Sequence, residues 1–140
     1  MHAFKSIIGL VLAGSLALPG LEAEAATPAE NQTGLETAAR ADTPGFSGFS
    51  AERGRQFFSS AHGNDWSCAS CHTSTPLAPG KHVKTGKEIA PMAPAANPQR
   101  FADAAKVEKW FNRNCRDVLG RVCTAREKGD VLAYLMSLAK

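Results

Sequence analysis

Two cysteines and a histidine stand together in the stretch C-A-S-C-H, as Cys68, Cys71 and His72. Cysteines at this spacing serve structural zinc sites, redox-active dithiols and covalent haem attachment. In haem attachment both thiols add to the haem vinyl groups and the adjacent histidine ligates the iron, so all three side chains must lie within one tight turn. The C-x-x-C-H pattern meets that requirement.

The sequence lacks the other features that a zinc site or a redox-active dithiol normally has. A structural zinc site normally needs four ligands, and the other two cysteines, Cys115 and Cys123, have a spacing that fits no common zinc ribbon. A thioredoxin-like dithiol requires a βαβ pattern, which is not visible. Because C-x-x-C-H occurs once, the sequence predicts one covalent haem c held by Cys68, Cys71 and His72.

The N-terminal segment predicts export. Lys5 precedes an apolar run at 7–18, which is too short to span a bilayer, and Ala23-Glu24-Ala25 resembles a signal-peptidase site. An uncleaved anchor or a buried N-terminal helix is the alternative. We expect residues 1–25 to be a signal peptide and the mature protein to be soluble in the periplasm.

The mature chain has the length of one domain. Residues 26–45 contain little to bury, and we expect a flexible arm with a short helix around 35–41, followed by a compact haem domain at 46–140. Removing the signal takes away Lys5, Glu22 and Glu24, which leaves 15 basic and 11 acidic side chains. The basic residues are spread along the chain, which gives no argument for nucleic-acid binding and at most a mild bias toward an acidic redox partner.

Two helices are expected to cross at a glycine. Ser50 is a candidate N-cap for a helix containing Gly54, and Thr124 and Glu127 form a capping-box pattern before an apolar helix at 131–138. A glycine within a helix suggests the close approach of another element. We expect Gly54 to mark the crossing, with Phe57 and Tyr134 packed there; the alternative is that the first helix ends one turn early.

The segment 101–115 is expected to form an amphipathic helix with Asp103 as its N-cap. At about 100° per residue, Asn114 projects from the middle of an apolar stripe formed by Val107, Trp110 and Phe111. A buried amide without partners costs a few kcal/mol, so Asn114 needs a hydrogen-bond network or a metal. Bonding to the helix end, to a haem propionate or to iron are all open. The polar face comprises Lys106, Glu108, Lys109, Asn112 and Arg113.

Cys115 and Cys123 remain after haem attachment. In an oxidising compartment such a pair most often forms a disulfide, with two free thiols as the alternative. A disulfide here would fix the end of the helix that carries Asn114.

Several side chains are candidates for the sixth iron ligand. An ordinary carrier would use methionine, for which Met92 and Met136 are available, although Met136 has the register of a packing residue. His62 and His82 would give bis-histidine ligation, but both lie in loops without an apolar face.

The chain from 46 to 140 resembles the sphaeroides haem protein family, a branch of the class I c-type cytochromes that is also described as a domain of unknown function. The resemblance rests on FSGFSAERGRQFF, HGNDWSCASCHT, TGKEIAPMAPAANPQRFADAAKVEKWFNRNC and the spacing of Cys115 and Cys123. It implies an all-α fold wrapped round one haem, a disulfide between these cysteines, and iron held by His72 and Asn114. It also implies a dihaem cytochrome c and a membrane cytochrome b as partners.

The resemblance predicts an electron-transfer protein rather than an enzyme. An amide oxygen is a hard donor that suits Fe(III) better than Fe(II), so we expect Asn114 to leave on reduction and oxygen, nitric oxide or carbon monoxide to bind. An enzyme that reduces oxygen or a nitrogen oxide, and an ordinary His/Met carrier using Met92, are the alternatives. The stripe around Asn114 offers no proton relay, which favours the carrier.

Two assignments remain open from the sequence. Lys87, Arg100 and Arg113 are candidates to hold the propionates, and carbonyls at 76–79 or at Pro91 are candidates to orient His72. We expect a monomer.

Overall fold

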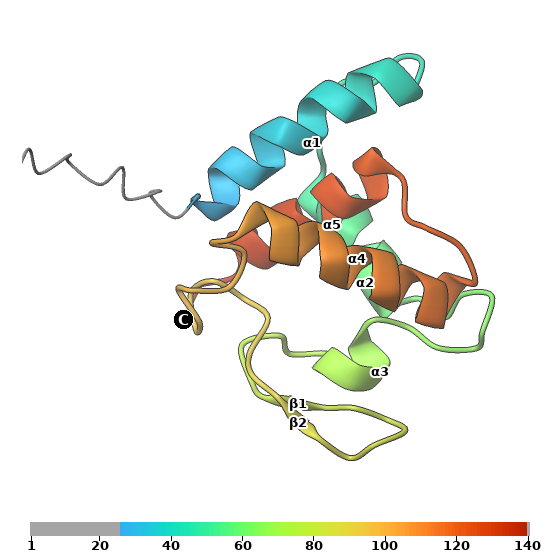
Figure 1. The fold of residues 1–140 in the computed structure, drawn as a ribbon, viewed down its shortest axis with the longest axis vertical. Coiled ribbons are helices and arrows are strands. Elements are labelled where there is room, and N and C mark those ends of the chain that lie inside the picture. The colour runs from blue at the N-terminus through green and yellow to red at the C-terminus, as the bar shows by residue number, and fades with distance from the viewer. Residues whose placement is uncertain (1–25, 140) are drawn as a thin grey trace, which may run out of the picture.

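The computed structural model describes residues 26–139 and contains five helices and a two-stranded ribbon within that range. The helices are α1 (Pro28–Asp42), α2 (Ala51–Ser59), α3 (Ala69–His72), α4 (Ala104–Leu119) and α5 (Ala125–Ser137). The strands β1 (Gly80–Lys81) and β2 (Glu88–Ile89) pair antiparallel. The all-α prediction is confirmed (Figure 1). The expected signal peptide lies outside the described residues, and none of the helices between 26 and 139 has the length and apolar character to cross a bilayer.

The segment expected to be a flexible arm forms the 15-residue helix α1, which packs on α5. Thr27 and Glu30 make a reciprocal capping box at its start. Ala39 is fully buried, and the Asn31 and Gln32 side chains donate hydrogen bonds to the carbonyls of Phe101 and Gly129. The helix is therefore docked through a small side chain and polar contacts, which a search for large apolar residues does not detect.

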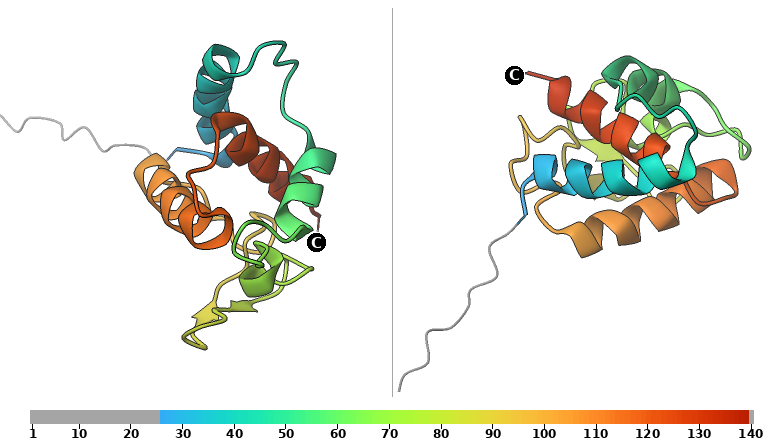
Figure 2. Two further views of the ribbon diagram at one scale, coloured as in Figure 1. Left: turned by 90° about the vertical axis from the view of Figure 1, so that its right-hand side faces the viewer. Right: turned by 90° about the horizontal axis from the view of Figure 1, so that it is seen from above.

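Helix α5 lies between α1 and α2 in both views of Figure 2. A Cβ built on Gly54 of α2 would lie 1.8 Å from the carbonyl oxygen of Asp130 and 3.0 Å from the Cβ of Tyr134. The predicted crossing at Gly54 is confirmed. The ring that packs on Tyr134 is Phe58, at a centroid distance of 5.6 Å, because Phe58 lies four residues after Gly54 on the same helix face. Phe57 instead stacks on His62.

Replacing Gly54 with alanine should lower the free energy of unfolding by about 1–3 kcal/mol, because the added methyl group forces α2 away from α5. Gly34, in α1, is the matched control. It has no atom within 4 Å of an added Cβ, so Gly34→Ala should be neutral or stabilising by about 1 kcal/mol. Denaturant unfolding of the two variants measures both changes, and equal effects would contradict the crossing.

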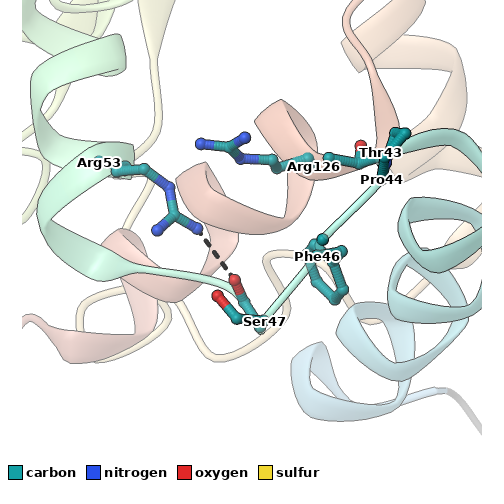
Figure 3. Close-up of a pocket in the computed structure, with 8 residues that line it drawn as sticks. Thr43, Pro44, Phe46, Ser47, Arg53 and Arg126 are labelled. Atoms are coloured by element: carbon teal, nitrogen blue, oxygen red, sulfur yellow. Dashed lines mark hydrogen bonds between the residues drawn. The ribbon is translucent and has the colours of Figure 1, made fainter.

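A buried carboxylate joins the start of α2 to α5. Asp130 is 4% exposed, accepts a hydrogen bond from the Ser50 backbone at 2.7 Å and pairs with the Arg53 guanidinium at 2.8 Å. Figure 3 shows a small pocket lined by Arg53, Arg126 and the 43–48 loop. None of its lining residues belongs to the C-A-S-C-H stretch, and we assign it to the packing of the α1–α2 connection.

The predicted caps of the last two helices are confirmed. The Asp103 side chain accepts from the Lys106 backbone at the start of α4, and Thr124 and Glu127 form a capping box on α5. Lys128 of α5 is buried and binds the Glu108 carboxylate of α4 at 2.7 Å. The central apolar cluster consists of Phe58, Phe101, Val131, Leu132, Tyr134 and Leu135.

Candidate haem-binding site

The C-A-S-C-H stretch forms the single turn that haem attachment requires. The backbone N–H groups of Cys71 and His72 both donate to the Cys68 carbonyl, at 3.2 and 3.0 Å, and α3 ends at His72. Neither Cys68 nor Cys71 is in a disulfide, and both are half-buried. Cys68 and Ala69 pack against the central apolar cluster. The two thiols and the imidazole therefore share one short helix on an apolar support.

The environment of Cys68 argues against metal-binding or redox thiolates. Burial raises the pKa of its thiol to about 11, whereas reactive and metal-binding cysteines have lowered values. Within residues 26–139 no group of three or more His, Cys, Asp or Glu side chains could hold a metal ion. The dithiol and zinc interpretations thus have no support in the geometry.

The His72 imidazole is neutral at physiological pH. Burial lowers its pKa to about 4, and the side chains of Arg100 and His82 contribute in the same direction. Its ring lies 6.3 Å from that of Phe58, measured between centroids, so α2 supports it. Within the described chain the buried Nδ1 atom has no hydrogen-bond partner. A neutral imidazole retains a lone pair for iron, as an axial ligand must.

Two of the carbonyls expected to orient His72, those of Pro76 and Pro91, accept other hydrogen bonds. The Pro76 carbonyl accepts from the backbone N–H groups of Met92 and Ala93, at 2.9 and 3.0 Å. The Pro91 carbonyl accepts from the side chains of Asn97 and Arg100, at 3.3 and 3.2 Å. These bonds fix the proline-rich loops to one another.

A close contact that the sequence analysis missed holds the β1–β2 ribbon against the attachment turn. A Cβ on Gly80 would lie 2.1 Å from the Cys71 carbonyl oxygen and 3.0 Å from the Cα of His72. Only glycine permits this approach, and the Pro79-Gly80 dipeptide was the available signal. Figure 1 shows α3 with α4 above it and the ribbon below.

Helix α4 presents Asn114 as a half-buried amide. Val107 and Phe111 pack against the apolar cluster, as expected for the inward stripe. The Asn114 side chain forms no hydrogen bond with the described residues, whereas Asn112 donates to the Glu108 carboxylate at 3.0 Å. This contact agrees with the prediction that Asn112 lies on the polar face of the helix.

Trp110, which was expected on the inward stripe, is only partly covered by the described protein atoms. Trp110 is 48% exposed, and the Arg113 guanidinium lies 5.6 Å from the centre of its ring. Trp110 and Asn114 are four residues apart, so they share one edge of α4 that protein atoms cover incompletely.

Cys115 and Cys123 form a disulfide, with 5.6 Å between their Cα atoms. Both are buried, and the bridge joins α4, just before its last turn, to the residue before the α5 N-cap. The residue after Asn114 is therefore covalently fixed.

The other candidate ligands are in less suitable positions. His62 bonds to the Phe57 carbonyl at 2.8 Å, and His82 Nδ1 accepts from the backbone of its own turn. Met136 is half-buried in α5, and Met92 packs against the apolar cluster. Met92 is the one that remains an alternative to Asn114.

A family model described as "Domain of unknown function (DUF1924)" matches residues 44–135. The chain is 45% identical over 130 residues to the cytochrome c-type protein SHP of Cereibacter sphaeroides, which covers 90% of this chain and 95% of the relative. The chain belongs to the sphaeroides haem protein family. It is also 46% identical over 83 residues to cytochrome c'' of Methylophilus methylotrophus, a match that covers 59% of this chain and 58% of that protein.

Solved structures agree with this membership of the sphaeroides haem protein family. Oxidised SHP, described as an oxygen-binding cytochrome c, aligns with a TM-score of 0.69 at 44% identity over 81% of this chain and 98% of its own. Oxidised cytochrome c'' aligns with a TM-score of 0.74 at 37% identity over 81% and 95%. A solution structure of cytochrome c'', described as giving insights into haem-ligand detachment, aligns at 0.71 and 36% identity over 81% and 94%.

Members of this family are c-type cytochromes, so the chain carries covalent haem c. The residues present fit that group: two unpaired thiols and a neutral imidazole lie in one turn on the apolar cluster. Cys68 and Cys71 would hold the vinyl groups and His72 the iron. When bound, the haem supplies a one-electron redox couple and an iron site for a second axial ligand.

Proposed function

We propose that the protein is an exported, periplasmic monohaem cytochrome c for electron transfer, in which Asn114 is a redox-labile axial ligand. Asn114 binds the oxidised iron and leaves the reduced iron, so that oxygen, nitric oxide or carbon monoxide binds in the ferrous state. The observation that carries the proposal is the half-buried Asn114 amide, which has no hydrogen-bond partner among residues 26–139. An unpartnered amide at such a position is available for coordination.

The chemistry of the amide explains the lability. Its oxygen is a hard, weak donor that suits Fe(III) better than Fe(II), which prefers nitrogen and sulfur. The Asp103 cap and the Cys115–Cys123 disulfide hold both ends of α4, so the amide returns to one place after each release. The descriptions of SHP as oxygen-binding and of haem-ligand detachment in cytochrome c'' support such behaviour by likeness.

An absorption spectrum of the reduced protein, with and without carbon monoxide, tests the proposal. We expect a high-spin ferric form and a ferrous form that binds carbon monoxide readily. A low-spin ferric form with a sulfur-to-iron band would instead assign the protein to the His/Met carriers, with Met92 as ligand. Turnover of oxygen, nitrite or hydroxylamine with a physiological electron donor would move it to the enzymes.

We further propose that a dihaem cytochrome c and a membrane cytochrome b exchange electrons with the protein through an acidic surface. Lys81, Lys84 and Lys87 on the β1–β2 ribbon are exposed, and they form no ion pair with the described residues. The ribbon lies against the attachment turn through Gly80, so these lysines belong to the element next to the turn that would hold the haem.

Replacing Lys81, Lys84 and Lys87 with glutamine should slow reduction by an acidic donor about tenfold at low salt, because electrostatic steering is lost. The measurement is the second-order rate constant as a function of ionic strength, which should become nearly flat in the variant. Lys109→Gln, an exposed lysine on α4, is the control and should leave the rate unchanged. Equal rates for all variants would contradict this docking face.

A further inference from the structure

The carbonyl groups in the last turn of α4 bind a loop from a distant part of the chain. The backbone N–H of Asn64 donates to the Val118 carbonyl at 3.1 Å. The side-chain Nδ2 of the same residue donates to the carbonyls of Asp117 and Arg116, at 2.9 and 3.3 Å. The last carbonyls of a helix lack regular partners within the helix, so donors from elsewhere complete their hydrogen bonding. Asn64 therefore caps the end of α4 from outside the helix.

The loop approaches the end of α4 closely because the residue before Asn64 is a glycine. A Cβ on Gly63 would lie 2.9 Å from the Leu119 carbonyl oxygen, which leaves no room for a larger residue. The loop is closed by a hydrogen bond from the His62 N–H to the Trp66 carbonyl at 2.9 Å. The His62 ring also bonds to the Phe57 carbonyl of α2 at 2.8 Å. In Figure 1 this connection between α2 and α3 passes beside the end of α4.

The same loop leads directly into the haem-attachment turn. Cys68 is four residues after Asn64. Ser67 and Ser70 close the start of the turn, because the side chain of each accepts from the backbone N–H of the other, at 3.1 and 3.0 Å. The His72 N–H then donates to the Cys68 carbonyl at 3.0 Å. A short, hydrogen-bonded path thus connects the end of α4 to the turn that carries His72.

The other contacts of α4 show why this path matters. Helices α1 and α2 pack closely on α5, whereas α4 approaches no described element over a comparable length. The first half of α4 is tied to α5 by the ion pair between Glu108 and Lys128, at 2.7 Å. The second half is tied to distant segments by the Cys115–Cys123 disulfide and by the hydrogen bonds from Asn64.

We propose that Asn64 is a positioning residue, which keeps the end of α4, and with it Asn114, in a fixed relation to the turn that carries His72. Asn114 directly precedes the turn whose carbonyls Asn64 binds, apart from the bridged Cys115. Loosening this connection lets the end of α4 drift, and a displacement of about 1 Å is enough to weaken an interaction that depends on geometry. The inference rests on the proposed ligation of ferric iron by Asn114.

Azide binding to the ferric holoprotein tests the proposal, because azide has to displace the amide from the iron. Its apparent affinity rises with the fraction of protein from which the amide has dissociated. Asn64→Ala should raise that affinity about tenfold, which corresponds to the loss of one or two hydrogen bonds. Asn64→Asp should raise it further, because a carboxylate in place of Nδ2 repels the helix carbonyls. Asn64 is exposed, so both variants leave the core intact.

Two comparisons separate positioning from a general loss of stability. Gln32→Ala removes another side-chain amide that binds a distant carbonyl, that of Gly129 at 3.2 Å. It should lower the stability and leave the azide affinity unchanged. In an Asn114→Ala background, Asn64→Ala should also leave the azide affinity unchanged, because no amide has to be displaced.

The outcomes distinguish this inference from the proposed ligation. If Asn114→Ala raises the azide affinity and Asn64→Ala does not, the positioning role is overturned and the ligand assignment stands. An effect of Asn64→Ala that persists without the Asn114 amide would also overturn the positioning role. If Asn114→Ala leaves the azide affinity unchanged, both proposals are wrong.

Amide hydrogen exchange tests the link itself, independently of events at the iron. The Gly120 N–H donates to the Arg116 carbonyl at 3.1 Å, in the turn that Asn64 caps. Its exchange should be about tenfold faster in Asn64→Ala, because the end of α4 opens more often. The Val107 N–H, which donates to the Asp103 carbonyl at 2.9 Å at the other end of α4, is the control and should exchange as in wild type. Unchanged exchange at Gly120 would overturn the proposal.

Discussion

The Asn114→Ala variant should show a markedly altered ferric absorption spectrum and an almost unchanged ferrous spectrum. The amide is proposed to bind only the oxidised iron, so its removal affects that state and leaves the reduced state as it was. Carbon monoxide should bind to the reduced variant with an affinity within a fewfold of wild type. The measurement is the pair of spectra from one sample before and after reduction, followed by a carbon monoxide titration.

Asn112→Ala is the matched control, because Asn112 is an amide on the same helix that donates to Glu108. It should leave both spectra unchanged. An unchanged ferric spectrum in Asn114→Ala would contradict the proposed ligation. If Met92→Ala altered the ferric spectrum instead, the sulfur of that packed loop residue would be the ligand.

The parts of the fold encoded by short patterns could be predicted from the sequence. The side chains of Ser50, Asp103 and Thr124 each accept from a backbone N–H three residues later, which is a relation within one turn. The Cys68–His72 turn is local in the same way, and its chemistry restricts it to one cofactor. Gly54 predicted the crossing of α2 and α5 correctly, because a glycine within a helix usually marks the close approach of another element.

The docking of α1 and the direction of Trp110 depend on contacts between distant segments. Asn31 and Gln32 bind carbonyls 70 and 97 residues away, and no local pattern encodes such partners. Helical periodicity assigned Trp110 to the inward stripe from its hydrophobicity, although its edge of α4 is only partly covered. Periodicity gives the angle of a side chain round its helix, whereas packing of the neighbouring elements decides which angles are buried.

The basic candidates for the haem propionates show the same limit for function. The sequence offered three basic candidates for the propionates without a reason to choose among them. The structure separates them by burial and partners: Arg100 is partly buried and bonded to loop carbonyls, while the other two are exposed. Such a choice depends on the loop connecting β2 to α4, whose path is determined by turns and carbonyl contacts rather than by periodicity.

Removing the disulfide with Cys115→Ser and Cys123→Ser should lower the free energy of unfolding by about 2–3 kcal/mol, because the bridge restricts the unfolded chain. Loss of the disulfide should also affect the binding of Asn114 to the haem iron, since Cys115 directly follows Asn114. The last turn of α4 would then be held mainly by Asn64, which donates to the Asp117 carbonyl at 2.9 Å. We expect a mixed ferric spectrum in which part of the population lacks the amide ligand, measured beside denaturant unfolding.

A double-mutant comparison separates the two effects. In the Asn114→Ala background the disulfide removal should cost the same stability and cause no further spectral change, because the ligand that the bridge positions is already absent. A further change in the ferric spectrum of the triple variant would mean that the bridge acts on the haem by a route other than Asn114. The end of α4 would then position the haem pocket as a whole rather than one ligand.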